Sequence, residues 1–381
     1  LFYDKKFVSQ YLSEAKIIPS FLQRLPNIKK FHPWFKFLFP SAIESFDFSG
    51  FDLVVSSSHE ISHGVLTKPE TKHICFYHSP SRLLWDRAHE YLNDFKKRGR
   101  GNFKLSLIRA GQHFLRLWDY AAAQRVDLPL ANSKHVAERI KKYYGREARV
   151  VYPPVETPGG DVRFAHSRAL QRRAPREEAV LPSVSTPGQS QNGLLIRSPN
   201  IPAWLTKNYF LIVSQLYPHK KIAFAVEAFK NIPELNLVII GDGPERKNLK
   251  SLSKKHGNIK LTGFVSDQEL PLYYKNCSGY IICNEEDFGI SPVEAMSFGK
   301  PVLALRRGGA METILENKTG EFFDELKLNV FTESIRAMND KIKNNYYNPE
   351  VLKKHSERFS HERFKKELLD IIKGLGYNFK S

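Results

Sequence analysis

Apolar runs alternate with amphipathic stretches through the first 156 residues of the chain. Four runs have the length and composition of buried strands, at residues 51–58, 73–77, 126–132 and 148–154. Helices are predicted over 103–118, where apolar residues recur at helical spacing, and between the cap residue Ser133 and Gly145. Because strands that alternate with helices pair into a parallel sheet covered on both faces, the pattern predicts a doubly wound, Rossmann-like α/β domain.

The alternation returns at residue 209 and is more regular there. Strands are predicted at YFLIVS, LNLVIIGDG, IKLTGF, GYIICN, PVLAL and TGEFF, and helices at KIAFAVEAFKN, SPVEAMSFG and METILEN. Ser266 and Glu269 have the spacing of a capping box at the start of another helix. We therefore predict a second doubly wound domain, which an amphipathic helix over 360–376 follows.

Residues 157–206 interrupt this alternation. They contain six arginines and no lysine, with frequent Pro, Ser, Gly and Gln and little periodicity. A linker, a foreign insertion and a translated frameshift all fit that composition. The predicted organisation is a first domain over 1–156, a linker or insertion over 157–206, a second domain over 207–358, and a helix over 359–381 that crosses back to the first domain.

Parallel sheets of this kind bind ligands beyond the carboxyl ends of their strands, so two such domains facing each other would form a cleft. The net charge of +18 over 381 residues favours an anionic partner in that cleft or on the surface, although a merely soluble surface would also carry it. The basic residues are dispersed and no nucleic-acid-binding motif is present, which argues against nucleic acid. Cys75, Cys277 and Cys283 are too few and too scattered for a disulfide framework or a zinc site, which favours the cytoplasm.

Residues 285–296, EEDFGISPVEAM, place acids around a predicted helix start in this basic chain. Ser291 is a favoured helix cap and Pro292 suits the first helical position, so Ser291 and Glu294 have the spacing of a simple capping box. Glu286 has no part in that box. The alternative is that amides from Gly289 to Ser291 bind a phosphate at the helix N-terminus, while the carboxylates accept hydrogen bonds from sugar hydroxyls.

The longer segment EEDFGISPVEAMSFGKPVLALRRGG (285–309) strongly resembles the donor-site signature of the retaining glycosyltransferases of family 4, which have the GT-B fold. The mark of that signature is Glu, seven residues, Glu. The resemblance implies that Glu286 holds the hydroxyls of the donor sugar and Glu294 those of the ribose. It also implies that the amides of Gly289, Ile290 and Ser291 hold the diphosphate.

Two further segments of the second half resemble the same family. VSQLYPHKKIAFAVEAF (213–229) is similar to its diphosphate-binding strand, loop and helix, and Lys220 falls on the family lysine. The family often has arginine where this chain has Gln215, which weakens that contact because Gln carries no charge. The backbone near Phe264 and Val265 is similar to the site that reads the nucleotide base.

In the first half, CFYHSPSRLLWD and ANSKHVAERIKKYYGREARVVYPPVE resemble acceptor-domain segments of bacterial mannosyltransferases of polysaccharide and O-antigen synthesis. His78, at the end of a predicted strand, is the candidate cleft histidine. Arg82 is a candidate for phosphate on donor or acceptor, and equally a surface arginine. Residues 1–40 do not supply the family's opening strand and glycine-rich loop, and the chain begins at Leu1, so we expect the first domain to be incomplete.

The resemblance implies a reaction as well as a fold. A sugar, with GDP-mannose as the favoured donor, is transferred with retention to a saccharide or lipid-linked saccharide, without a cofactor or a metal ion. Glu286, His78 and Lys220 are the catalytic candidates, and a helix N-terminus together with Lys220 stabilises the leaving diphosphate. A nucleotide-sugar epimerase of similar architecture, and a truncated relative that only binds partners, are the alternatives.

Basic and apolar side chains are also interleaved in the predicted helices of 80–118. Such a stretch can lie on an anionic membrane, which would place a cytoplasmic enzyme peripherally at the inner face, close to a lipid-linked acceptor. A solvated charged face is the alternative. The residues concerned are Lys96, Lys97, Arg98, Arg100, Lys104, Arg109 and Arg116, beside Phe103, Leu107, Phe114 and Trp118.

Overall fold

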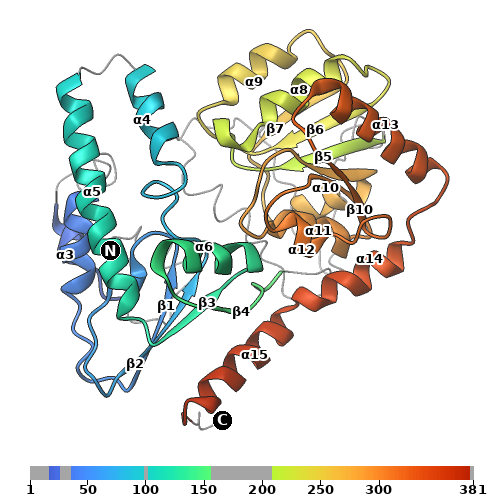
Figure 1. Cartoon of the computed structure of the whole chain (residues 1–381). Coiled ribbons are helices and arrows are strands. Elements are labelled where there is room, and N and C mark those ends of the chain that lie inside the picture. The colour runs from blue at the N-terminus through green and yellow to red at the C-terminus, as the bar shows by residue number, and fades with distance from the viewer. Residues whose placement is uncertain (1–16, 26–35, 98–101, 156–207, 378–381) are drawn as a thin grey trace, which may run out of the picture. The chain divides into compact units, whose positions relative to one another are not determined.

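The computed structural model describes residues 17–25, 36–97, 102–155 and 208–377, and divides into two compact units, Leu1–Tyr152 and Pro153–Ser381 (Figure 1). The predicted linker or insertion over 157–206 lies outside the described residues. Each unit contains a parallel sheet with helices packed on it. The doubly wound α/β architecture predicted from the alternation of strands and helices is confirmed.

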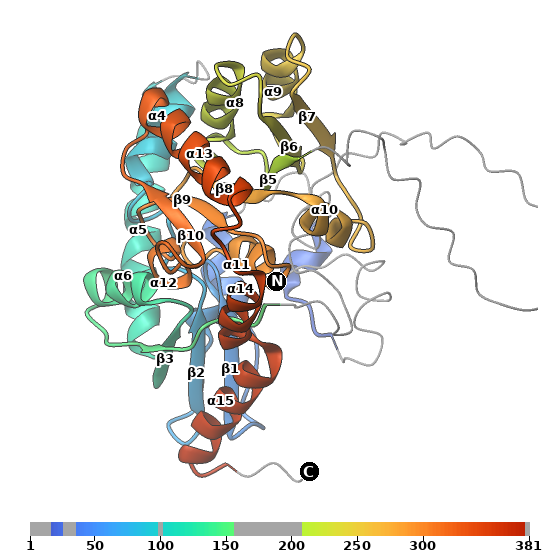
Figure 2. The ribbon, with the colours of Figure 1, turned by 90° about the vertical axis from the view of Figure 1, so that its right-hand side faces the viewer.

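The first unit contains a four-stranded parallel sheet in the order β1-β2-β3-β4. Figure 2 shows β1 and β2 side by side, and Val55 is paired with Ile74 in their register. The predicted strand over 148–154 is only two residues long, because the chain leaves the sheet edge before Pro153. The strands are β1 (Leu53–Ser58), β2 (Lys72–Tyr77), β3 (Leu128–Ala131) and β4 (Arg149–Val150).

Two long helices of this unit pack against each other, α4 (Ala88–Lys97) and α5 (Asn102–Gln124) (Figure 1). α5 contains the predicted 103–118 helix and continues beyond it. α6 (Lys134–Tyr144) begins after Ser133, whose side chain caps it, and ends at Gly145 in the left-handed conformation, as predicted. The shorter elements are η1 (Phe21–Arg24), η2 (Lys36–Leu38), α3 (Phe39–Glu44) and η3 (Ser62–Gly64).

The second unit contains a six-stranded parallel sheet in the order β10-β9-β8-β5-β6-β7. The chain enters at β5, adds β6 and β7 on one side, and then returns to place β8 on the other side. β5 and β8 therefore flank a topological switch point. The strands are β5 (Tyr209–Val213), β6 (Asn236–Ile240), β7 (Ile259–Gly263), β8 (Gly279–Ile282), β9 (Val302–Leu305) and β10 (Gly320–Phe323).

Helices cover both faces of this sheet, with α8, α9 and α13 on one side and α10 and α11 on the other (Figure 1). The predicted METILEN helix is shorter than expected, because the chain turns at Ile314 toward β10. The elements are η5 (Pro218–Lys220), α8 (Ile222–Lys230), α9 (Arg246–Ser253), α10 (Leu270–Asn276), α11 (Ile290–Ser297), α12 (Ala310–Thr313), α13 (Leu328–Lys343), α14 (Pro349–Ser356), η6 (Glu357–Phe359) and α15 (His361–Gly374).

Candidate functional site

The switch point of the second sheet brings two sequence-distant loops to the same edge. β5 pairs with β6 on one side and with β8 on the other, and all three strands are parallel. The loop that follows β5 and the loop that follows β8 therefore begin at the same carboxyl edge. Ligands of open parallel sheets bind outside this position, because the chain diverges there in both directions.

Lys220 and Glu286 meet at this edge. The Lys220 Nζ lies 2.6 Å from the Glu286 Oε1, and the Asn284 side-chain amide donates to the same oxygen at 3.1 Å. The side chains of Lys220 and Glu286 keep 19% and 25% of their surface exposed, so solvent and ligand can reach both. The structure thus brings together two of the residues that the sequence selects, although 66 positions separate them.

Two glycines after β9 hold the Glu286 loop in place. Gly308 forms an isolated parallel bridge with Glu286, and the Gly309 N–H donates to the Glu286 carbonyl at 2.9 Å. A Cβ atom on Gly309 would lie 2.4 Å from the Phe288 Cα, which no side chain could avoid. The sequence motif includes this glycine pair, and the structure explains it by close backbone packing.

Helix α11 begins one residue earlier than predicted. Gly289 is its cap residue, at φ +88°, and no side chain caps the helix. The prediction that Ser291 is the N-cap is therefore wrong, because the left-handed turn at Gly289 lets Ile290 start the helix and buries Ser291 in its first turn. Within the described part of the chain, the amides of Gly289 and Ile290 have no acceptor, which leaves them available to an anion.

Glu294 lies beneath this surface. Its side chain is 0% exposed, and its Oε2 accepts a hydrogen bond from the Tyr274 hydroxyl at 2.7 Å. Burial, followed by the nearby Glu294 carboxylate, raises the pKa of the Tyr274 phenol well above its usual value. The capping-box interpretation is wrong, because this carboxylate points into the core of the unit. Its contact with a ribose stays a prediction, and in this conformation protein atoms enclose it.

The remaining donor candidates lie along the same edge of the sheet. Gln215 follows β5 in a loop that residues 241–245 brace, since Leu216 exchanges backbone hydrogen bonds of 2.9 Å with Asp242 and Glu245. Phe264 and Val265 follow β7, two strands away from β5 in the sheet order. Phe264 is partly exposed and Val265 is buried. These positions suit a ligand that extends along the edge.

His78 follows β2 in the first unit, at the strand end where the sequence predicts it. Its Nε2 lies 2.8 Å from the Ser57 hydroxyl, and burial, with a smaller contribution from His59, lowers the pKa of the imidazole to about 4. The ring is therefore neutral near pH 7 and can donate or accept one hydrogen bond. Arg82 pairs with Asp86 at 3.2 Å, and Asp86 also pairs with Arg139 at 2.9 Å, so a contact of Arg82 with phosphate stays a prediction.

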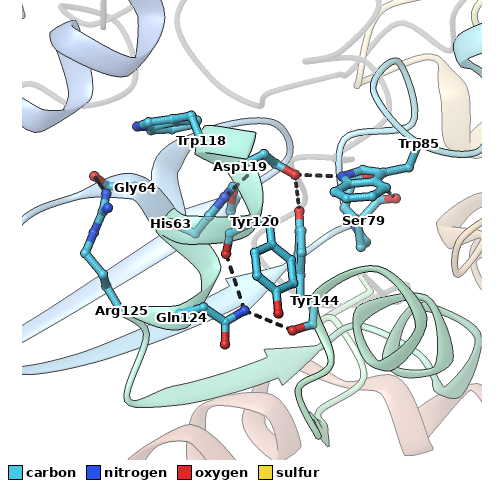
Figure 3. Close-up of polar contacts among 12 residues, drawn as sticks. His63, Gly64, Ser79, Trp85, Trp118, Asp119, Tyr120, Gln124, Arg125 and Tyr144 are labelled. Carbon is cyan, nitrogen blue, oxygen red and sulfur yellow. Dashed lines mark hydrogen bonds and ion pairs between the residues drawn. The ribbon is translucent and has the colours of Figure 1, made fainter. Parts of the chain in front are cut away.

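A buried polar cluster around Asp119 was not predicted. Asp119 and His63 are almost fully buried, and the His63 Nε2 lies 3.3 Å from the Asp119 Oδ1 (Figure 3). The Asp119 Oδ2 accepts hydrogen bonds from the Trp85 indole at 2.7 Å and the Tyr144 hydroxyl at 2.8 Å. The four residues come from separate segments of the chain, so no local sequence pattern predicts that they meet. We call this set the Asp119 cluster.

The described residues show neither a metal-ligand cluster nor a membrane-spanning helix. Across the described ranges, no three His, Cys, Asp or Glu side chains converge as metal ligands. No helix among the described residues has both the length and the apolar character needed to cross a bilayer. All three cysteines are buried and free, and burial raises the pKa of the Cys75 and Cys277 thiols to about 12.

Comparisons with known proteins match both halves of the chain. The family described as "Glycosyl transferases group 1" matches residues 197–357, and "Glycosyltransferase Family 4" matches residues 8–158. An uncharacterized glycosyltransferase of Methanocaldococcus jannaschii is 29% identical over 161 residues, which is 41% of this chain and 45% of the relative. The alpha-1,3/1,6-mannosyltransferase of Dictyostelium discoideum is 25% identical over 194 residues, 44% of this chain and 46% of the relative.

A GDP-mannose-dependent phosphatidylinositol monomannoside mannosyltransferase of Mycolicibacterium smegmatis is 28% identical over 138 residues, 32% of this chain and 36% of the relative. The chain thus spans less than half the length of these three curated relatives. Among solved structures, sucrose-phosphate synthase from Thermosynechococcus elongatus matches 94% of this chain and 82% of its own, with a TM-score of 0.63 and 15% identity. The Anabaena protein HepE in complex with UDP matches 97% and 89%, with a TM-score of 0.60 and 16% identity.

Proposed function

This chain belongs to glycosyltransferase family 4, with the GT-B fold, and from that premise we propose that it transfers a sugar from a nucleotide sugar to a saccharide or lipid-linked saccharide. The pairing of Lys220 with Glu286 at the switch point is the observation that carries the proposal. A cation and a carboxylate that both remain partly exposed suit a ligand with a diphosphate next to a polyol. In this structure, the two groups neutralise each other.

Each of the two groups has a role in the transfer. Lys220 offsets the negative charge that grows on the leaving diphosphate as its bond to the sugar breaks, and the Gly289 and Ile290 amides add fixed dipoles. Glu286 accepts hydrogen bonds from hydroxyls of the donor sugar and holds it in register. The acceptor hydroxyl attacks from the side of the leaving group, so configuration is retained, and its proton passes to the diphosphate oxygen.

We place the acceptor site in the first unit. The neutral His78 imidazole, oriented by Ser57, hydrogen-bonds a hydroxyl of the acceptor and adds no charge. A protonated histidine would instead compete with Lys220 for the negatively charged diphosphate. We assign no substrate contact to Arg82, because its guanidinium is already paired with Asp86, which Arg139 also contacts.

GDP-mannose is the proposed donor, with no metal ion. The support is the names of two relatives, one an alpha-1,3/1,6-mannosyltransferase and one a GDP-mannose-dependent enzyme. Mannose and glucose donors differ in the base and at one sugar carbon, so direct titration separates them.

The proposed location is the cytoplasm, on the surface of an anionic membrane. The support is a row of exposed apolar side chains along α5 at helical spacing: Phe103, Leu107, Phe114 and Leu117. Lys104 lies beside the row. Trp118, also expected there, instead donates its indole N–H to Glu44 at 2.7 Å. Of the predicted basic set, Arg98 and Arg100 lie outside the described residues.

Co-sedimentation with vesicles tests this location. Vesicles with anionic lipid should pull the protein down at low salt, and a Leu107→Ser, Phe114→Ser variant should remain in solution. Equal sedimentation of the variant would contradict the docking surface.

Calorimetric titration with GDP-mannose, UDP-glucose and UDP-N-acetylglucosamine tests the donor site. Lys220→Gln and Glu286→Gln should each lower the rate of transfer by about 10²–10³-fold, the effect of removing one charge-stabilising group. The matched control is Lys230 with Glu227 in the same unit, an ion pair of the same 2.6 Å length, whose Gln variants should leave transfer unchanged. Binding of none of the three donors would overturn the proposal, and an epimerised sugar formed without acceptor would favour the epimerase.

A further inference from the structure

A cavity of about 480 Å³ lies between α4 and α5 in the first unit. Its lining comes from α4, α5, the segment before α4 and the end of α6, so it belongs to the first unit alone. This volume is typical of small-molecule sites, which range over about 300–1,000 Å³. The donor site lies in the second unit, so it does not account for this cavity.

One side of the cavity is apolar and rigid. Leu84 and Leu92 contribute aliphatic surface, and the Trp85 ring stacks on Tyr143 with their centroids 5.1 Å apart and their planes at 17°. The indole N–H of Trp85 is fixed by Asp119, as Figure 3 shows. The Asp119 cluster therefore holds one wall of the cavity in a set orientation.

The other side of the cavity is cationic. Arg109, Gln112 and Arg116 line it from one face of α5, at positions i, i+3 and i+7. Among the side chains that the structure describes, which do not include that of Asp94 in α4, neither arginine has a carboxylate within ion-pair distance, and the buried Arg116 Nε has no acceptor. Arg82, Arg125 and Arg139 of the same unit are all paired with carboxylates.

Gln112 completes the polar side. Its side chain is 5% exposed, and its Nε2 donates to the Leu83 carbonyl at 3.2 Å. Its Oε1 is buried and has no donor among the described residues. A buried acceptor without a donor costs about 1–3 kcal/mol, so a ligand hydroxyl at this position would stabilise the site.

We propose that this cavity binds one molecule of an amphiphile that carries a phosphorylated head group on a hydrocarbon chain. The phosphate oxygens pair with Arg109 and Arg116, whose guanidinium groups suit phosphate, and a head-group hydroxyl donates to Gln112. The hydrocarbon chain lies on Leu84, Leu92 and the Trp85 ring. A free sugar would leave the apolar wall unused, and a neutral lipid would leave both arginines without a counter-ion.

The proposal extends the proposed function, since such an amphiphile is the class of molecule that a lipid-linked acceptor represents. Its test contains no nucleotide sugar, so its outcome is independent of whether the chain transfers sugar. Farnesyl phosphate, below its aggregation concentration, is titrated calorimetrically into the whole chain. Farnesol and inorganic phosphate are the arms that separate the chain from the head group.

We expect saturable binding of farnesyl phosphate with one molecule per chain, and binding at least tenfold weaker for farnesol and for phosphate. Arg109→Gln should weaken the binding of farnesyl phosphate about tenfold or more, and so should Arg116→Gln. Because Arg109 is exposed, its variant keeps the fold, which thermal unfolding checks. Lys104→Gln is the charge-matched control on the same helix and should leave the affinity unchanged.

Three results would overturn the proposal. They are equal affinities for farnesol and farnesyl phosphate, phosphate binding as tight as that of farnesyl phosphate, and an Arg109→Gln variant with unchanged affinity. Vesicle binding distinguishes a bilayer from the single amphiphile. The two arginine variants should sediment with anionic vesicles as the parent does, and their loss from vesicles with unchanged farnesyl phosphate affinity would assign the arginines to the bilayer instead.

Discussion

The loop after β8 in the second unit and the Asp119 cluster in the first unit each hold a carboxylate in a fixed position. The two carboxylates differ in their hydrogen-bond partners and in their exposure to solvent. Glu286 pairs with Lys220 and Asn284 and keeps a quarter of its side-chain surface exposed. Asp119 is 0% exposed and accepts hydrogen bonds from Trp85 and Tyr144. A ligand can replace the partners of Glu286 without unfolding anything, whereas the partners of Asp119 belong to the core.

This difference indicates that Glu286 belongs to a binding site, whereas Asp119 holds other side chains in place. Glu286 is positioned by backbone contacts with Gly308 and Gly309, so its loop does not depend on the ion pair that its side chain makes with Lys220. The Asp119 carboxylate is itself the element that positions others, among them the Trp85 ring that lines the amphiphile cavity. Substitutions at the two places should therefore differ in whether they affect stability or ligand binding.

The largest expected effect is at Asp119. Asp119→Ala leaves the Trp85 indole and the Tyr144 hydroxyl without an acceptor in the core, and should lower the free energy of unfolding by about 3–5 kcal/mol. Urea unfolding, followed by tryptophan fluorescence, measures it. Glu90→Ala, which breaks an exposed 2.9 Å ion pair with Arg87, is the control and should cost no more than about 1 kcal/mol. Equal costs would show that the cluster carries no special weight.

The pH dependence of stability should report a second buried group of the first unit. His73 is fully buried, its Nε2 lies 2.8 Å from the Ser56 hydroxyl, and burial, followed by the nearby His63, lowers the pKa of its imidazole to about 4. As pH falls from about 6.5 to 4, His73 becomes protonated in the unfolded chain but stays neutral in the folded chain. Stability should therefore fall by on the order of 3 kcal/mol over that window.

Urea unfolding between pH 4 and 7.5 measures this loss. His73→Asn should be less stable at pH 7 but should show a shallower decline toward acid pH. A variant with the parent's slope would mean that other groups produce the dependence.

A smaller effect is expected beneath the donor loop. Tyr274→Phe removes the hydroxyl that donates to the buried Glu294 carboxylate, and should cost about 1–3 kcal/mol of unfolding free energy. Tyr346→Phe is the control, because Tyr346 is half exposed and its ring contacts the Lys341 ammonium and the Tyr347 ring rather than a buried carboxylate, so its change should stay within about 0.5 kcal/mol. If Tyr274→Phe were as mild, Glu294 would not depend on that hydrogen bond.

The smallest expected change is in donor affinity through the glycine pair. Gly309→Ala forces a methyl group against the Phe288 backbone, shifts the Glu286 loop, and should weaken nucleotide-sugar binding about tenfold, or about 1.4 kcal/mol. Gly257→Ala, where a Cβ would meet nothing within 4 Å, is the matched control. If calorimetry finds that both variants bind the nucleotide sugar as tightly as the parent, the Glu286 loop does not contribute to donor binding.

The strands and helices could be predicted because their patterns are local. The apolar runs at 73–77 and 209–213 became β2 and β5, and Ser133 and Gly145 bound α6 as expected. The start of α11 was misplaced, because Ser291 is a better cap by side chain but Gly289 alone accepts the left-handed turn. The preference of serine for the N-cap position therefore predicted the wrong start, because the left-handed backbone at Gly289 determines where the helix begins.

The site residues divide in the same way. Glu286 and Lys220 could be selected from the sequence because a motif marks each of them, and the structure shows that the two meet at the switch point. The burial of Glu294 and the Asp119 cluster were not predictable, because they depend on contacts between segments that are far apart in the sequence. His63, Trp85, Asp119 and Tyr144 have no common spacing, so only the folded chain shows that they meet.

Amide hydrogen exchange in the presence of the bound nucleotide sugar tests the donor site most directly. Protection should rise over 286–293 and 216–222, the two segments that follow β8 and β5, and should stay unchanged over 128–144 in the first unit. A donor that binds by calorimetry but protects neither segment would contradict the assignment of the switch point as the donor site.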